Sequence, residues 1–314
     1  PEREHCIFSV TLWPGIHGDS SAKNFGEDKS YWLVSGCFIT VFLLCNMFKY
    51  ILLLSILGMS CRPVIHIQWP QRNSSLGGSS FYQEAAAMNW AQRDSFVLDQ
   101  VFSGDIPSFI KDFVPVHVSV TDNNTGKMIS GVFYAAPDYL SIGTNDDWAR
   151  INITPMAAQR IADSLNCFLP TRKMVDDIYN AAIQKLEPIP MYAFRDSTPT
   201  MWQHHLIIEG QRKGRKGLIA GIKKDVVISE KISRDKRPNR VAIYGWHKKD
   251  GQPIQPLYTG HVNWWVDYSQ GIRLIYRKIR IGRKWVDYTD VLKDPLLKGL
   301  LCDEAFCDFY RYDY

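Results

Sequence analysis

The stretch "VPVHVSVTDNNTGKMISGVFYAAP", residues 114–137, decides the fold of this chain. Apolar and polar residues alternate before and after residues 123–126, where asparagine, threonine and glycine favour a turn. Alternation with a period of two around such a turn is typical of a β-hairpin. The sequence "YLSIGT" at residues 139–144 predicts another short strand. An antiparallel sheet is therefore expected to begin in the first half of the chain.

Helices are expected on both sides of this hairpin. Residues 81–104, "FYQEAAAMNWAQRDSFVLDQVFSG", contain good helix formers with apolar residues near helical spacing, and they end at a glycine. Residues 154–186 predict two helices separated by a Leu-Pro pair. Thr154 and Thr171 are suitable N-cap residues for these two helices.

The pattern changes to strands from residue 205 onwards. Segments rich in β-branched and aromatic residues alternate with glycine or charged turns. We predict an α+β fold with a single main domain over residues 81–314, in which N-terminal helices and a hairpin are followed by a mostly antiparallel sheet. The predicted strands are "HHLIIEG", "GLIAGIKKDVVIS", "RVAIYGWH", "GIRLIYRKIRI" and "KWVDYTDVL".

Composition narrows the possible functions. The formal net charge of the 314 residues is +5, and acidic residues are interspersed with basic ones almost throughout, so no nucleic-acid partner is predicted. Ten tryptophans and fifteen tyrosines are many for this length. Aromatic side chains either fill a core or stack on ligands such as sugars, and both alternatives stay open at this point.

The segment "MFKYILLLSILGMSCRPV", residues 47–64, has the order of a secretory signal. A lysine precedes an apolar run, and small residues and Cys61 follow it. The apolar run is too short to span a bilayer, for which about 20 residues are needed. The cysteine after this run resembles the lipobox of bacterial lipoproteins. The resemblance implies a signal peptide at residues 47–60, lipidation of Cys61, and an exported protein anchored to a bacterial membrane that faces the periplasm or the cell surface.

The flanks of this segment are predicted to lie outside the folded domain. Residues 1–46 show no helical or strand period, and we predict that they are an upstream extension that is not native, or are disordered. The alternative joins residues 31–48 to residues 50–57 as one signal-anchor helix, but Lys49 would then lie inside the span at a cost of a few kcal/mol. Residues 61–80 are rich in Pro, Ser and Gly and predict a flexible tether.

The cysteine spacing indicates no zinc knuckle. Only three of the seven cysteines, Cys167, Cys302 and Cys307, fall in the predicted domain, and none forms a CxxC pair. Cys302 and Cys307 are candidates for a disulfide in an oxidising compartment. Cys167 lies several residues before the expected helix start at Thr171, so a buried structural thiol is favoured over a nucleophile.

The best candidate site is the segment "GWHKKDGQPIQPLYTGHVNWWVDYSQGIRL", residues 245–274. Histidine is suited to general acid–base chemistry near neutral pH. We predict His261 as the general base and Asp267, six residues later, as the group that orients it. Lys223 or His247 would stabilise developing negative charge, and His205 is a second acid–base candidate. The predicted substrate-binding residues are Tyr244, Trp246, Trp265, Tyr268 and Arg273.

Two further features bear on this site. In a strand, Lys223 and Asp225 would share one face and Lys224 would occupy the other, so one lysine is expected in the site and the other in solvent. No hydrolase, nucleotide or dinucleotide motif is present, and no cofactor is predicted. Zinc stays open, because four suitable ligand residues lack a diagnostic spacing: His205, His247, His261 and Asp267.

Two functions are consistent with these features. The first is a cell-envelope hydrolase that acts on peptidoglycan or another extracellular glycan or peptide. The alternative is a non-catalytic carbohydrate-binding lipoprotein that uses its tryptophans. Four segments of the sequence resemble segments of exported bacterial proteins: "LPTRKMVDDIY", "AGIKKDVVIS", "RVAIYGWH" and "VDYSQGIRL". This resemblance covers most of residues 110–300 and implies export and one coherent domain, but no activity. Nothing in the sequence predicts an oligomeric state.

Overall fold

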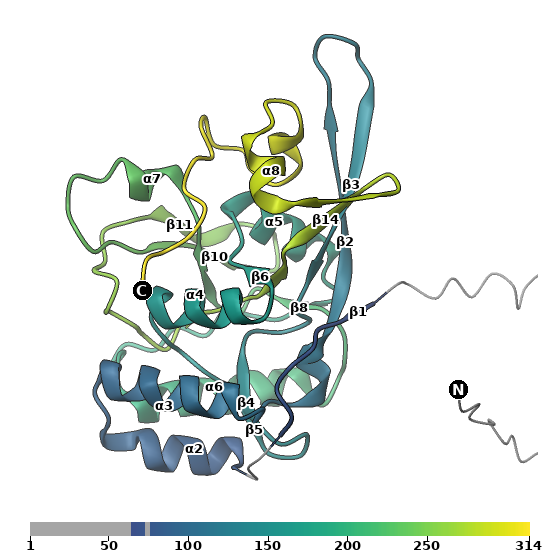
Figure 1. The fold of residues 1–314 in the computed structure, drawn as a ribbon. Coiled ribbons are helices and arrows are strands. Elements are labelled where there is room, and N and C mark those ends of the chain that lie inside the picture. Colours follow the sequence, from purple (N-terminus) through teal and green to yellow (C-terminus); the bar gives the residue numbers. More distant parts are fainter. Residues whose placement is uncertain (1–63, 73–75) are drawn as a thin grey trace, which may run out of the picture. The chain divides into compact units, whose positions relative to one another are not determined.

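A long hairpin projects from the domain (Figure 1). The structure, a computed structural model, describes residues 64–72 and 76–314. Strands β2 (Asp112–Thr121) and β3 (Met128–Ala135) pair antiparallel over their whole length, as their alternating sequence predicts. The turn between them is closed by Asp122, whose carboxylate accepts hydrogen bonds from the backbone N–H of Asn124 and the hydroxyl of Thr125. The hairpin is the centre of the larger of the two main sheets.

The larger sheet collects strands from distant parts of the sequence. Its main order is β1-β2-β3-β13-β6, and β14 also pairs with β3 and carries β15 at its other side. All of these pairings are antiparallel. The added strands are β1 (Ile65–His66), β6 (Cys167–Phe168), β13 (Ile275–Tyr276), β14 (Lys278–Ile281) and β15 (Lys284–Asp287).

A second sheet of four strands carries three of the predicted site residues, Tyr244, Trp246 and His247, on β10. Its order is β11-β10-β9-β12, with only β12 and β9 parallel. Two two-stranded ladders, β4-β5 and β7-β8, complete the strands of the described residues. The bounds are β4 (Ser141–Gly143), β5 (Trp148–Arg150), β7 (Gln184–Lys185), β8 (Ile219–Ala220), β9 (Lys224–Val227), β10 (Ala242–His247), β11 (Pro253–Tyr258) and β12 (Gln270–Gly271).

The helices begin at capping side chains. The hydroxyls of Thr154 and Thr171 accept hydrogen bonds from the third backbone N–H of α4 (Pro155–Ser164) and α5 (Arg172–Ala181), so both predicted caps are confirmed. The remaining helical segments are α2 (Gly78–Glu84), η1 (Ala85–Ala87), α3 (Trp90–Phe102), η2 (Ser108–Lys111), α6 (Thr198–Arg212), α7 (Glu230–Ser233), α8 (Tyr288–Lys293) and η3 (Leu297–Leu300).

Three helices differ from the sequence-based prediction. The strand expected at "KWVDYTDVL" ends at Asp287, and the remaining residues lie in α8. The single helix expected over residues 81–104 is interrupted, because Asn89 caps a new helix, α3, through a reciprocal bond with Gln92. The strand expected at "HHLIIEG" is wrong, since these residues lie in α6. Ser197 caps α6 and a proline occupies its first turn, and these signals outweigh the short apolar run.

The described part of the predicted tether is packed on the domain. Within residues 61–80, Ile65 pairs with Phe113 of β2, Ile67 is buried, and Gly78 begins α2. Four apolar side chains in this stretch, Ile65, Ile67, Trp69 and Leu76, explain why it joins the core instead of remaining in solvent. Three predictions lie outside the described residues: the non-native or disordered extension at residues 1–46, the signal peptide at residues 47–60 and the lipidation of Cys61.

The α+β class and the single domain are confirmed. One hydrophobic cluster takes side chains from both sheets and from several helices, and residues 61–314 form one compact unit. Cys302 and Cys307 form a disulfide, while Cys167 is a buried free thiol whose pKa is raised by burial. Over the residues described, no helix combines the length and the apolar character that crossing a membrane requires.

Candidate functional site

Asp267 holds two cations and a serine together, and we call Asp267, Ser269, Lys224 and Arg195 the Asp267 cluster. Its Oδ2 atom lies 2.8 Å from Arg195 Nη2 and 3.6 Å from Lys224 Nζ. Its Oδ1 atom accepts from the backbone N–H and the hydroxyl of Ser269 at 2.9 and 2.6 Å. The parallel pairing of β12 with β9 brings Lys224 opposite Gln270, directly after these residues.

The sequence predicts that Asp267 orients the His261 ring. In the structure, Asp267 acts on His261 only through its charge. Among the described residues no hydrogen bond joins the two side chains, because Asp267 is occupied by its cations and Ser269. His261 is near enough for all three charges to influence it. Burial and the cations Lys224 and Arg195 lower the pKa of His261, although Asp267 opposes them. His261 is therefore neutral near pH 7.

The charge state of the Asp267 cluster follows from its contacts. Burial works to raise the pKa of Asp267, but Lys224, Ser269 and Arg195 together hold it below its usual value. Asp267 is thus ionised, and its one negative charge faces two positive charges. Burial lowers the pKa of Lys224, and Asp267 counteracts this effect. The Asp267 cluster keeps a net charge of about +1 when both cations are protonated.

Partly exposed aromatic side chains surround His261. The His261 ring stacks on Trp265 with 6.3 Å between centroids, and the Tyr258 ring meets it edge-on at 5.3 Å. The exposed fractions are 45% for Tyr258, 41% for the neighbouring Trp264 and 37% for Trp265. We call Tyr258, His261, Trp264 and Trp265 the aromatic surface. Trp264 lies in a turn and Trp265 directly follows it, and both are outside the named strands.

The backbone fixes the aromatic surface on the edge of the second sheet. Arg240 and Val262 form an isolated antiparallel bridge. The backbone N–H of Asn263 donates to Asn239 at 2.8 Å, and that of Trp265 donates to Val262 at 3.0 Å. Because these bonds hold both ends of the turn, its exposed rings need little ordering on contact with a ligand.

The backbone of Trp246, in β10, is strained. Trp246 has φ +59°, which is unusual for a bulky residue, and it follows Gly245 at φ +107° where the β10–β11 register shifts. The resulting bulge aims the indole at the second sheet's lysines, and Lys224 Nζ lies 5.4 Å above the ring. Trp246 is buried, so it supports Lys224 and has little surface for a ligand. A strained residue at this place is consistent with a functional constraint.

Arg195 was not predicted from the sequence. It lies in the segment between β7 and α6, and the backbone of this segment is tied to the candidate site. The N–H of Tyr268 donates to the carbonyl of Arg195 at 2.9 Å, and the Tyr268 hydroxyl accepts from the N–H of Met191 at 2.6 Å. Tyr268 therefore positions this segment and is buried, instead of contacting a ligand as predicted.

His247 and Tyr244 lie in a separate group around Asp176 of α5. His247 Nε2 is 2.8 Å from one carboxylate oxygen of Asp176, and the Tyr244 hydroxyl donates to both oxygens at 2.9 and 3.0 Å. The His247 ring is buried and stacks on Tyr179. These contacts join β10 to α5, and no hydrogen bond in the described residues links them to His261.

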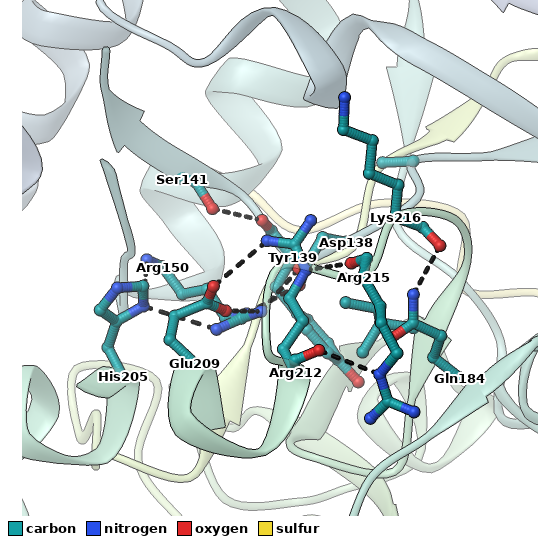
Figure 2. A network of polar contacts seen from close by, with 12 residues as sticks. Asp138, Tyr139, Ser141, Arg150, Gln184, His205, Glu209, Arg212, Arg215 and Lys216 are labelled. Atoms are coloured by element: carbon teal, nitrogen blue, oxygen red, sulfur yellow. Dashed lines mark hydrogen bonds and ion pairs between the residues drawn. The ribbon is translucent and has the colours of Figure 1, made fainter. Parts of the chain in front are cut away.

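His205 belongs to a buried ion-pair network (Figure 2). We call Arg150, Asp138, Glu209 and His205 the Arg150 network. Arg150 donates to both oxygens of Asp138 at 2.8 and 2.7 Å and to Glu209 at 2.8 Å. His205 Nδ1 accepts from the backbone N–H of Arg150 at 3.3 Å. Burial and Arg150 hold the pKa of His205 well below its usual value, so His205 is neutral and structural.

Lys223 and Arg273 also have structural partners. Lys223 donates to the carbonyl of Tyr268, and burial together with Arg150 lowers its pKa to about 7. Arg273 donates to the carbonyls of Ala136 and Ile219 at 2.8 and 2.7 Å. Lys224 is also buried, so the expectation that one of the two lysines is in solvent is wrong.

The predicted site residues therefore divide into separate groups. The structure brings His261, Asp267 and Trp265 together and adds Lys224, Arg195 and Tyr258. Within residues 64–72 and 76–314, no group of three or more His, Cys, Asp or Glu side chains is arranged to hold a metal ion. The chain matches no protein-family model, and the searches of curated proteins and of solved structures gave no match either.

Proposed function

We propose that the protein binds a glycan of the bacterial cell envelope at the aromatic surface. The observation that carries this proposal is the group of partly exposed rings around His261. Sugar rings stack on such side chains, because their C–H faces are apolar while their hydroxyls stay hydrated. The Asp267 cluster lies beside the rings and supplies charged donors for the polar edges of a sugar.

The positions of the histidines favour binding over a histidine-based active site. His205 and His247 are buried in contacts with Arg150 and Asp176, so they do not converge on His261. Trp265, in contrast, is partly exposed and stacks on the His261 ring. The location at the envelope rests on the predicted signal peptide and on Cys61, which also supply the proposed lipid anchor.

Trp265→Ala tests the binding proposal. Removing the ring that stacks on His261 is expected to weaken binding to soluble peptidoglycan fragments about tenfold or more, or about 1.4 kcal/mol. Isothermal titration calorimetry on the purified protein measures this change. The matched control is Trp285→Ala, which removes a similarly exposed tryptophan from β15. Equal binding by the two variants would contradict the proposal.

Hydrolysis of the same ligand is the second candidate function. The observation that favours it is a neutral, half-buried His261 beside the cations Lys224 and Arg195. In this proposal His261 removes a proton from water, and the two cations stabilise the negative charge that develops on the substrate. Asp267 positions the cations and does not orient the imidazole.

Zymography on peptidoglycan separates the two functions. If the protein is a hydrolase, the wild type clears the substrate and His261→Ala does not. The control is His117→Ala, which alters an exposed histidine on β2 and should leave clearing intact. Binding of peptidoglycan by the wild type without clearing would support the binding function alone.

A further inference from the structure

We infer that the ligand of the aromatic surface is an acidic glycan, and that Arg195 binds its sugar carboxylate. This inference rests on the proposed glycan-binding function and adds the charge of the ligand to it. It follows from the charge balance of the Asp267 cluster, from the free edge of Arg195, and from the side chains next to Arg195.

The charge balance leaves room for one more anion. Among the residues that the structure describes, Asp267 is the single carboxylate that contacts both Lys224 and Arg195, and its two oxygens are already shared among these cations and Ser269. A second carboxylate at this place would neutralise the remaining positive charge. A neutral sugar would leave that charge uncompensated, so the site should prefer an acidic ligand.

Arg195 presents the groups that such a ligand needs. Its side chain is 46% exposed, and only Nη2 is bonded to Asp267, at 2.8 Å. Within the part of the chain that the structure describes, Nε and Nη1 of Arg195 have no hydrogen-bond partner. A guanidinium binds a planar carboxylate through two parallel N–H bonds, a geometry that a lysine does not offer. Because Nη2 has two hydrogens and makes one bond to Asp267, its second N–H can form such a pair with Nε or Nη1.

The segment around Arg195 carries two further exposed aromatic side chains. Tyr192 and Phe194 are among the most exposed large apolar side chains of the described residues, at 90% and 81%. The bonds of Met191 and Arg195 to Tyr268 hold this segment next to Asp267. Exposed rings therefore occupy the residue directly before Arg195 in the sequence and the residue three positions before it.

Arg195→Gln tests the inference in the full chain. Two probes are compared by affinity electrophoresis at about physiological salt: polygalacturonate, whose sugars carry carboxylates, and a neutral chito-oligosaccharide. The wild type should bind polygalacturonate at least tenfold more tightly than the neutral probe. Arg195→Gln should lose most of that difference and keep its affinity for the neutral probe.

A matched variant controls for net charge. Arg234→Gln removes an exposed arginine that is also ion-paired to an aspartate, Asp308, on another element. It should retain the preference for polygalacturonate. Equal wild-type affinity for both probes, or an equal loss in Arg195→Gln and Arg234→Gln, would overturn the inference and leave glycan binding in place. If the wild type bound neither probe nor peptidoglycan fragments, the proposed function itself would be contradicted.

Discussion

Two aspartates of this protein are held by cations, and their surroundings differ in one respect. Asp138 pairs with Arg150, and both side chains are buried. Asp267 is equally buried, but its partner Arg195 is nearly half exposed. Both side chains of the Asp138 pair, which we call the closed pair, are shielded from solvent, while the Asp267 pair has an edge, on Arg195, that reaches solvent. A charged pair with such an edge is the better candidate for ligand binding.

The largest expected effect is the loss of the closed pair. Asp138→Asn leaves the Arg150 guanidinium buried with less compensation and should lower the free energy of unfolding by about 3–5 kcal/mol. Asp267→Asn should cost less, about 1–3 kcal/mol, because Arg195 can turn to water and only Lys224 is left buried without its carboxylate. Urea unfolding measures both values, with Glu84→Gln on the exposed face of α2 as the control. An equal decrease in the free energy of unfolding for Asp138→Asn and Asp267→Asn would contradict the proposed difference between the two ion pairs.

A pH effect of several kcal/mol is expected from Lys223. Its pKa is lowered from 10.5 to about 7 by burial and by Arg150, so the folded protein releases a proton that the unfolded chain keeps. Stability should therefore rise with pH from about 7 towards 10.5. Urea unfolding at pH 7 and pH 10 should show this rise in the wild type and in the control Lys127→Met, and a smaller rise in Lys223→Met. An equal rise in stability between pH 7 and pH 10 in all three proteins would contradict the assignment of this pH effect to Lys223.

The disulfide should contribute about 2 kcal/mol. Cys302 and Cys307 are five residues apart, and closing so short a loop restricts the unfolded chain only modestly. Cys302→Ser with Cys307→Ser should reduce the free energy of unfolding by that amount in thermal or urea unfolding. The control is the wild type treated with a reducing agent, which should match the double variant. Unchanged stability in both cases would show that the bond contributes little.

Local signals account for the elements that the sequence predicts correctly. The β2–β3 hairpin follows from alternation around one turn, and α4 and α5 follow from threonine caps. The α6 helix was mistaken for a strand because a short apolar run has no diagnostic period, and the capping serine before it was not weighed.

The site depends on contacts that local patterns do not contain. Lys224 meets Asp267 because β12 runs parallel to β9, a pairing between residues more than forty positions apart in the chain. Arg195 reaches Asp267 from an irregular segment with no sequence pattern. The residue types around His261 were predictable, but their partners were not.

Hydrogen exchange tests the central claim most directly. The full chain is compared with and without soluble peptidoglycan fragments and, separately, with polygalacturonate. The account predicts slower exchange in residues 258–268 and 191–197 and no change in residues 138–150, where the closed pair lies. Protection confined to residues 138–150, or no protection with any glycan that the protein binds, would contradict the assignment of the aromatic surface as the binding site.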